Sequence, residues 1–200
     1  MSRRPDLPLA GDPPPRERAD AARNRARVLA AAEKLFAERD PLTVTMDDIA
    51  KAAGIGRGTL YRRYPDRASI ARALLGEHER ALQERLMRGP APLGPGDGAT
   101  PAERLAAFYE AMLDLLQTHV NVLCAEASAR YATGAYAFWR LHVRHLAHQA
   151  GVEDADTIAD LLLAPLAPDL YRDQRERGVS DERIRAGLTA LAYRTLSPRQ

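Results

Sequence analysis

The sequence has very little cysteine, and a single thiol excludes several kinds of protein. Cys124 is the only cysteine in 200 residues, so neither an intrachain disulfide framework nor a multi-cysteine metal site can form. No apolar run approaches the roughly 20 residues that span a bilayer. Residues 1–20 contain basic side chains but no apolar segment after them, so we expect no secretory signal. These absences favour a cytoplasmic protein with no membrane partner.

The sequence motifs of common enzymes are absent as well. The chain has no phosphate-binding loop, no Gly-rich nucleotide fingerprint, no nucleophile elbow and no HExxH pair. Glu110 and Asp114 form an i, i+4 carboxylate pair, which on a helix is typical of a solvated face. We therefore expect neither an enzyme nor a bound cofactor.

Positive charge is concentrated in one short block near the N-terminus. Residues 16–67 hold 12 Arg/Lys against 8 Asp/Glu, whereas residues 68–200 hold 15 against 17. Such an excess is expected where one block of a chain contacts a polyanion, although a solvated helix face gives the same count. The charge therefore indicates nucleic acid only if a binding motif lies in the same block.

Apolar residues recur at helical spacing, and the chain has neither strand-like alternation nor an internal repeat. We predict an all-α fold, with a small N-terminal three-helix domain followed by a larger helical domain. Residues 1–18 are Pro-rich and are predicted to be a disordered arm. The small basic domain is predicted over residues 19–66 and the larger domain over residues 67–200.

The helical pattern is predicted to start near Asp20 and to end just before Pro41. After a helix capped by Asp66, the Gly- and Pro-rich stretch 89–100 is predicted to be a loop. Further helices are then expected around the apolar stripe 105–116 and over residues 120–130, 136–150, 158–176 and 181–196. Pro165 and Pro168 should kink or restart the helix that contains them.

Residues 45–64 carry the local signals of a helix-turn-helix. Thr45 and Asp48 have the spacing of a capping box at the start of a helix. Gly54 lies where that helix must stop with a left-handed residue. A second short helix is then expected from about residue 57 to 64. Two helices joined by a short turn containing glycine form the unit that places a recognition helix in the major groove of DNA.

The outward face of the second helix carries side chains suited to DNA. Leu60 is expected to point into the three-helix core, which leaves Arg57 on the outside. Arginine can donate two hydrogen bonds to a guanine edge, the commonest specific base contact. The free N–H groups at the start of the first helix of this motif are expected to form a phosphate site. The residues predicted to contact bases or phosphates are Thr45, Arg57, Gly58, Thr59, Tyr61, Arg63 and Arg67.

This motif also resembles a known family. Residues 42–75 read LTVTMDDIAKAAGIGRGTLYRRYPDRASIARALL, which closely resembles the N-terminal signature of TetR-type (tetracycline-repressor-like) regulators. The resemblance extends over residues 23–75. It implies an all-α homodimer that binds a palindromic operator as a repressor. It also implies a small effector that releases this repressor from DNA. Asp47 stands where several relatives have a basic residue, and Arg63 where His or Asn is frequent, so no operator sequence is implied.

The resemblance implies a function for each part of the chain. Residues 19–66 are expected to be the helix-turn-helix DNA-binding domain. Residues 67–200 are expected to be the ligand-binding and dimerisation domain. Dimerisation is expected through the last two helices, where Gly187 permits close approach. The leucine-rich stripe available there comprises Leu161, Leu162, Leu166, Leu170, Ile184, Leu188 and Leu191.

The effector is expected to be small and apolar or aromatic. Pockets for such molecules are mostly apolar with few polar groups, although ordinary core packing produces the same composition. The candidate effector-binding residues are Phe108, Tyr109, Met112, Leu116, Tyr131, Trp139 and His142.

Two alternatives to effector release remain open from the sequence. His142, His145 and His148 form an H-x-x-H-x-x-H pattern, which suggests a metal-responsive regulator. Steps of three residues drift around a helix, however, so all three imidazoles cannot share one face. The second alternative is a DNA-binding dimer with no sensing function.

Overall fold

The computed structural model describes residues 15–39, 43–96, 98–126 and 131–197. Every regular element in these residues is helical, which confirms the predicted all-α class. The chain divides into two compact units, Met1–Leu74 and Leu75–Gln200. Residues 1–14 of the predicted arm, and the proline expected to follow the first helix, lie outside the described residues. None of the described helices is long and apolar enough to cross a membrane.

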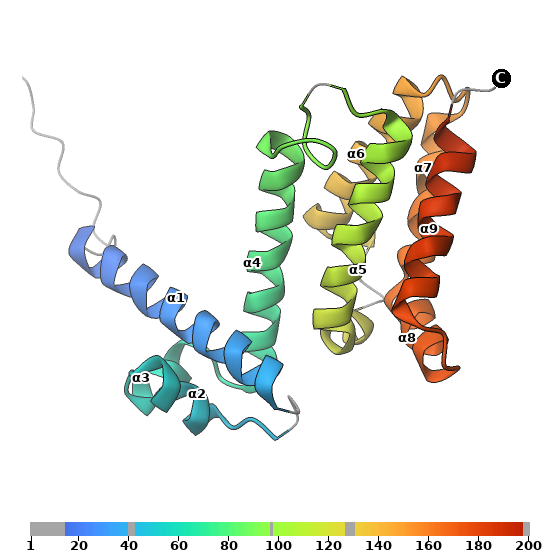
Figure 1. Cartoon of the computed structure of the whole chain (residues 1–200). Coiled ribbons are helices and arrows are strands. Elements are labelled where there is room, and N and C mark those ends of the chain that lie inside the picture. The colour runs from blue at the N-terminus through green and yellow to red at the C-terminus, as the bar shows by residue number, and fades with distance from the viewer. Residues whose placement is uncertain (1–14, 40–42, 97, 127–130, 198–200) are drawn as a thin grey trace, which may run out of the picture. The chain divides into compact units, whose positions relative to one another are not determined.

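The described residues of the N-terminal unit form three helices and the start of a fourth, which Figure 1 labels. They are α1 (Pro15–Glu38), α2 (Met46–Ala53), α3 (Arg57–Arg63) and the first turns of α4 (Arg67–Arg88). α1 begins at Pro15 rather than near Asp20, because proline suits the first turn of a helix and good helix formers follow it. Asp66 caps α4 as predicted, since its Oδ1 accepts a hydrogen bond from the Ser69 N–H at 2.7 Å.

One small core holds the helices of this unit together. Val28 of α1, Ile49 of α2 and Leu60 of α3 are all buried in it. Ile70 and Leu74 of α4 are buried in the same cluster. The first two turns of α4 therefore pack in the N-terminal unit, which extends to Leu74.

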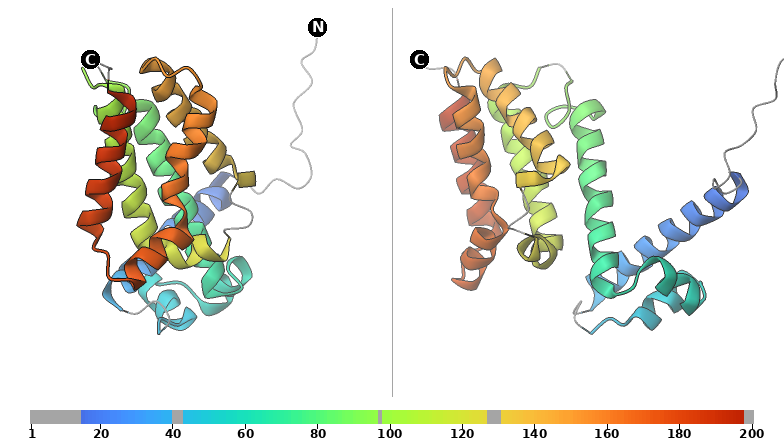
Figure 2. Two further views of the ribbon diagram at one scale, coloured as in Figure 1. Left: turned by 90° about the vertical axis from the view of Figure 1, so that its right-hand side faces the viewer. Right: turned by 180° about the vertical axis from the view of Figure 1, so that it is seen from behind.

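The C-terminal unit contains the rest of α4 and a set of packed helices (Figures 1 and 2). They are α5 (Pro101–Ala125), α6 (Gly134–Gln149), α7 (Ala155–Leu163), the 3₁₀ turn η2 (Ala164–Leu166), α8 (Pro168–Glu176) and α9 (Asp181–Leu196). The prediction of a separate helix over residues 120–130 is wrong, because no glycine or proline interrupts residues 102–125 and α5 runs through them. The predicted restart at the prolines is confirmed, since Pro165 lies in η2 and Pro168 begins α8.

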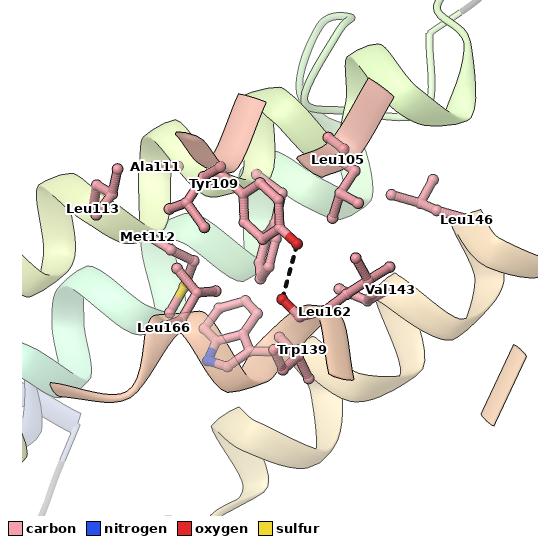
Figure 3. Close-up of a cluster of buried hydrophobic side chains, with 14 of the residues drawn as sticks. Leu105, Tyr109, Ala111, Met112, Leu113, Trp139, Val143, Leu146, Leu162 and Leu166 are labelled. Carbon is pink, nitrogen blue, oxygen red and sulfur yellow. Dashed lines mark hydrogen bonds between the residues drawn. The ribbon is translucent and has the colours of Figure 1, made fainter. Parts of the chain in front are cut away.

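α5 lies at the centre of the C-terminal unit. It packs against α6, α8 and α9, and α5 and α9 run side by side in Figures 1 and 2. Its Leu105 and Tyr109 are buried with Trp139 and Val143 of α6 in one apolar cluster (Figure 3). The Tyr109 hydroxyl donates a hydrogen bond to the Leu162 carbonyl at 2.8 Å, which joins α5 to α7 (Figure 3). A buried phenol normally needs such a partner.

Candidate functional site

The start of α2 is fixed by the predicted capping box. The Thr45 Oγ1 accepts the Asp48 N–H at 3.1 Å, and the Asp48 Oδ2 accepts the Thr45 N–H at 3.0 Å. The hydrogen bonds from Thr45 hold the pKa of the Asp48 carboxyl below its usual value. The box satisfies two N–H groups that have no partner inside the helix. A short sequence pattern therefore sets where the first helix of the motif begins.

The turn after α2 depends on a glycine and on an arginine from α1. Gly54 has φ 61°, a left-handed conformation, and its N–H bonds back to the carbonyls of Ala50 and Lys51. Arg27 donates from Nη2 to the Gly54 carbonyl at 2.9 Å. A Cβ atom at Gly54 would lie 2.5 Å from that same nitrogen. The sequence predicted the glycine but not Arg27, because no local pattern indicates a contact between residues 27 positions apart.

α3 buries one side chain and exposes its neighbours. Leu60 is 1% exposed, whereas Tyr61 is 47% exposed. A Cβ atom at Gly58 would meet no other atom within 4 Å, so packing within the chain does not require a glycine there. The α3 residues predicted to contact DNA are all exposed: Arg57, Gly58, Thr59, Tyr61 and Arg63.

Arg57, the predicted base reader, is paired across the turn with Asp47 of α2. Its Nε donates to the Asp47 Oδ1, and its Nη2 faces the Asp47 Oδ2. Both side chains remain partly exposed, 69% for Arg57 and 46% for Asp47. The sequence marked Asp47 only as a departure from the family pattern and did not predict this contact.

Two residues predicted to bind phosphates also hold the motif together. The Thr45 hydroxyl donates to the Asp48 Oδ2 at 2.7 Å, in addition to its part in the capping box. Arg67 donates from Nη1 to the Val44 carbonyl at 3.2 Å, which ties the start of α4 to the segment before α2. Substitution of either residue therefore changes the fold of the motif as well as any contact with phosphate.

The buried core and the exposed basic face of α3 identify the N-terminal unit as a helix-turn-helix domain. Residues 28–74 match the family model described as bacterial regulatory proteins, tetR family. An HTH-type transcriptional regulator of Mycobacterium tuberculosis is 43% identical over 91 residues, which cover 46% of this chain and 43% of that protein. The HTH-type transcriptional repressor BepR of Brucella suis is 34% identical over 103 residues, or 52% of this chain and 47% of that repressor.

Solved structures share the fold along most of the chain. A transcriptional regulator from Saccharomonospora viridis, solved in complex with choline, has a TM-score of 0.68 and 21% identity, covering 90% of this chain and 100% of that one. NalD of Pseudomonas aeruginosa has a TM-score of 0.54 and 22% identity, covering 88% and 98%. At these identities the likeness concerns the fold alone.

Residues 28–74 of the N-terminal unit therefore form a domain of the tetR family of bacterial regulatory proteins. The chain spans about half the length of the curated relatives that it matches.

In the C-terminal unit, the structure brings together all but one of the predicted effector-binding residues. The Phe108 ring lies 6.0 Å from the Trp139 ring and 5.4 Å from the His142 ring, between centroids. Tyr109, Met112 and Leu116 are buried in the same core as Phe108. Tyr131 does not join them: it is 68% exposed and packs edge-on against Tyr136 instead.

Two buried nitrogen atoms near this cluster have no hydrogen-bond partner among the described residues. They are the Arg104 Nε and the His142 Nε2. Burial, together with the charges of Arg104 and His145, lowers the pKa of His142 to about 4. The imidazole is therefore neutral near pH 7, and its Nε2 either donates or accepts one hydrogen bond, depending on the tautomer. The sequence predicted His142 for this site but not Arg104.

The metal-binding alternative loses its structural basis. In the part of the chain that the structure describes, no three His, Cys, Asp or Glu residues are placed to hold a metal ion. His142 is half-buried, whereas His145 and His148 are exposed. The three imidazoles diverge around α6, as steps of three residues require.

The predicted dimer stripe is wrong in most of its members, because they face the core of their own chain. Leu162, Leu166, Ile184 and Leu188 are buried, and the apolar side of α9 packs against α5. Leu191 is half-buried, and Leu161 and Leu170 are exposed. α9 instead exposes small residues on its outward side: Ala186, Gly187 and Ala190.

Proposed function

We propose that this chain is a sequence-specific DNA-binding transcriptional regulator, a repressor that binds a palindromic operator as a homodimer. The observation that carries the proposal is the folded helix-turn-helix, in which Leu60 is buried while Arg57 is exposed beside it. The excess of basic residues in the same block supports contact with a polyanion. In this proposal the helix-turn-helix domain of residues 19–66, together with Arg67, binds DNA, and the rest of residues 67–200 binds the effector and dimerises.

Each exposed residue of α3 has a distinct role in the proposed complex. Arg57 reads a guanine edge in the major groove. Gly58 leaves room for the groove wall, since nothing within the chain fills the space beside it. The remaining contacts fix the register on phosphates, with Thr59 also able to touch a thymine methyl group: Thr45, Thr59, Tyr61, Arg63 and Arg67.

Selection of DNA from a random pool by the full chain tests this proposal. We expect an inverted repeat with half-site centres about one helical turn, roughly 34 Å, apart. Affinity for the selected DNA should fall steeply with salt, because bound arginines displace counterions from phosphates. A pool with no enriched sequence, or an enriched site without a repeat, would contradict the proposal.

The outward side of α9 is the proposed dimer face. A Cβ atom at Gly187 meets nothing within 4 Å inside the chain, so a partner helix can approach closely there. Tyr193, 42% exposed, supplies an apolar surface on the same helix. The test is sedimentation of Gly187→Arg, which should be monomeric where the unmodified chain is dimeric. Ala137→Arg, at an exposed position of α6, is the matched control and should stay dimeric.

We propose that the effector has an apolar or aromatic body and one hydrogen-bonding group. Phe108 and Trp139 supply the apolar surface, and the buried nitrogens of Arg104 and His142 supply the polar contact. The complex of the Saccharomonospora viridis regulator with choline supports the binding of small molecules by this fold.

A panel of small aromatic acids, alcohols and amides tests the effector site. Compounds that bind should raise the melting temperature of the full chain and release it from its operator. Arg104→Met keeps the length of the side chain without its donors and should abolish both effects. If no compound in a broad panel does either, the non-sensing dimer becomes the better description.

A further inference from the structure

The contact between Asp47 and Arg57 uses only one side of the guanidinium group. The carboxylate oxygens lie against Nε and Nη2, which is a side-on, bidentate arrangement. A guanidinium has five N–H bonds in one plane. Two of them point at Asp47, and the three others, on Nη1 and on the far side of Nη2, point away from it.

Those remaining N–H bonds are the ones that guanine recognition needs. The major-groove edge of guanine presents two acceptors, N7 and O6, which match two parallel N–H donors of one arginine. The end of the guanidinium, formed by Nη1 and Nη2, supplies such a pair. Arg57 can therefore stay bound to Asp47 and bind guanine at the same time.

Asp47 is not the residue that closes the capping box of its own helix. The carboxylate that closes the capping box belongs to Asp48, which bonds to the backbone and the hydroxyl of Thr45. Asp47 is next to it in the sequence, and its carboxylate pairs with Arg57. An acidic side chain beside a DNA-binding face repels phosphates, so its presence there lowers affinity for DNA of any sequence.

From this geometry we propose that Asp47 is a specificity-determining residue that positions Arg57 for guanine. The proposal rests on the proposed DNA-binding function. A free arginine side chain has many rotamers, and holding it in one orientation reduces the entropy lost on binding. Asp47 also keeps Arg57 from turning to a nearby phosphate, because that move would leave the carboxylate unpaired beside the DNA. The pair therefore favours guanine and penalises every other base.

The test compares two DNA duplexes bound by the full chain at fixed salt. One is the operator selected from random DNA. In the other, adenine replaces one guanine, the one at the position where the variant Arg57→Ala has lost the preference for guanine. The unmodified chain should discriminate between them by roughly 5- to 150-fold, the range for one bidentate pair. Asp47→Ala should reduce that ratio at least about fivefold, and it should bind the substituted duplex more tightly than the unmodified chain does.

Two controls separate positioning from charge. Glu38→Ala removes one negative charge from the same unit at an exposed residue that pairs with Lys34, and it should leave the ratio unchanged. Asp47→Ala combined with Arg57→Ala should discriminate no less than Arg57→Ala alone, because Asp47 acts only through Arg57. Asp47 is partly exposed, so the melting temperature of Asp47→Ala should match that of the unmodified chain.

Three outcomes would overturn the proposal. If Asp47→Ala binds both duplexes more tightly by the same factor, the residue acts through charge alone. If it loses preference at a different base pair, Asp47 reads a cytosine amino group itself. If the unmodified chain selects no DNA sequence, both the DNA-binding function and this inference fail, whereas the first two outcomes leave DNA binding intact.

Discussion

The two units of this chain place their candidate functional residues in opposite environments. In the N-terminal unit all the residues proposed to contact DNA are exposed except Arg67, which is half-buried, and a small core of buried side chains holds them in place. In the C-terminal unit most of the residues proposed to bind an effector are themselves part of the core. Function and stability therefore depend on different side chains in the first unit, except at Thr45 and Arg67, and on the same side chains in the second.

The largest effects should come from core truncations that separate the two units. Leu60→Ala should destabilise the N-terminal unit by about 2–5 kcal/mol and abolish DNA binding. Trp139, the only tryptophan, lies in the C-terminal unit, so its fluorescence unfolding curve should not move. Phe108→Ala should lower the free energy of unfolding obtained from that curve by about 3–5 kcal/mol. If Leu60→Ala shifts the tryptophan transition equally, the units do not unfold separately.

A pH titration should distinguish the units by their buried histidines. Burial, with His78 nearby, lowers the pKa of His119 to about 4, and His142 is lowered to a similar value. Both are thus neutral in the folded state over a range in which the unfolded chain binds protons, so stability is full above about pH 6.5 and falls as the pH drops towards 4. In His119→Gln the free energy of unfolding, followed by tryptophan fluorescence, should depend less on pH. Its fall between these two pH values should be smaller by about 3 kcal/mol than in the unmodified chain.

The matched control for this titration is His148→Gln, at an exposed position of α6. It makes the same substitution at an exposed site, so a change of slope shared by both variants is not due to the burial of His119. An unchanged slope in His119→Gln would mean that carboxylates, and not this buried histidine, govern the acid sensitivity of the C-terminal unit.

Removing the proposed base contact should cost less than removing a core residue. Arg57→Ala should weaken operator binding by about 1–3 kcal/mol and relax the preference at one base pair. Arg67→Ala should weaken binding to all sequences alike, since phosphates carry no sequence information. It should also lower the stability of the N-terminal unit, because it removes the bond to the Val44 carbonyl. Gel-shift titrations on specific and random DNA measure both effects.

Gly58→Ala should have the smallest effect on the fold, yet it should clearly weaken DNA binding. Alanine in a helix is about 0.5–1 kcal/mol more stable than glycine, and nothing in the chain obstructs its methyl group. The variant should therefore melt slightly higher and bind the operator more weakly. Gly76→Ala, in α4 with equally open surroundings, should gain stability without losing affinity. Equal affinities for the two variants would remove Gly58 from the DNA interface.

The features that could be predicted from sequence are those determined by neighbouring residues. The capping box of α2, the left-handed Gly54 and the bounds of α9 follow from patterns a few residues long. The bonds from Arg27 to Gly54 and from Arg57 to Asp47 could not be predicted, because they cross between helices and have no periodic signal.

The same limit explains the errors in the C-terminal unit. Leu162 and Leu188 have the spacing of an interface stripe, but the same spacing serves a core, and only the packing of α9 on α5 shows which one they form. Tyr131 follows a segment that the periodicity assigned to a helix, and the structure exposes it. Arg104 gave no signal, since a lone arginine on a helix is typical of a solvated face.

The central claim is that the exposed face of α3 reads DNA sequence, and binding of the full chain to its selected operator tests it most directly. Fluorescence anisotropy would compare the unmodified chain with Arg57→Ala on the operator and on an unrelated duplex of equal length. We predict that Arg57→Ala loses roughly 5- to 150-fold on the operator, for a contact of about 1–3 kcal/mol, and much less on the unrelated duplex. Full affinity of Arg57→Ala for the operator would contradict the account.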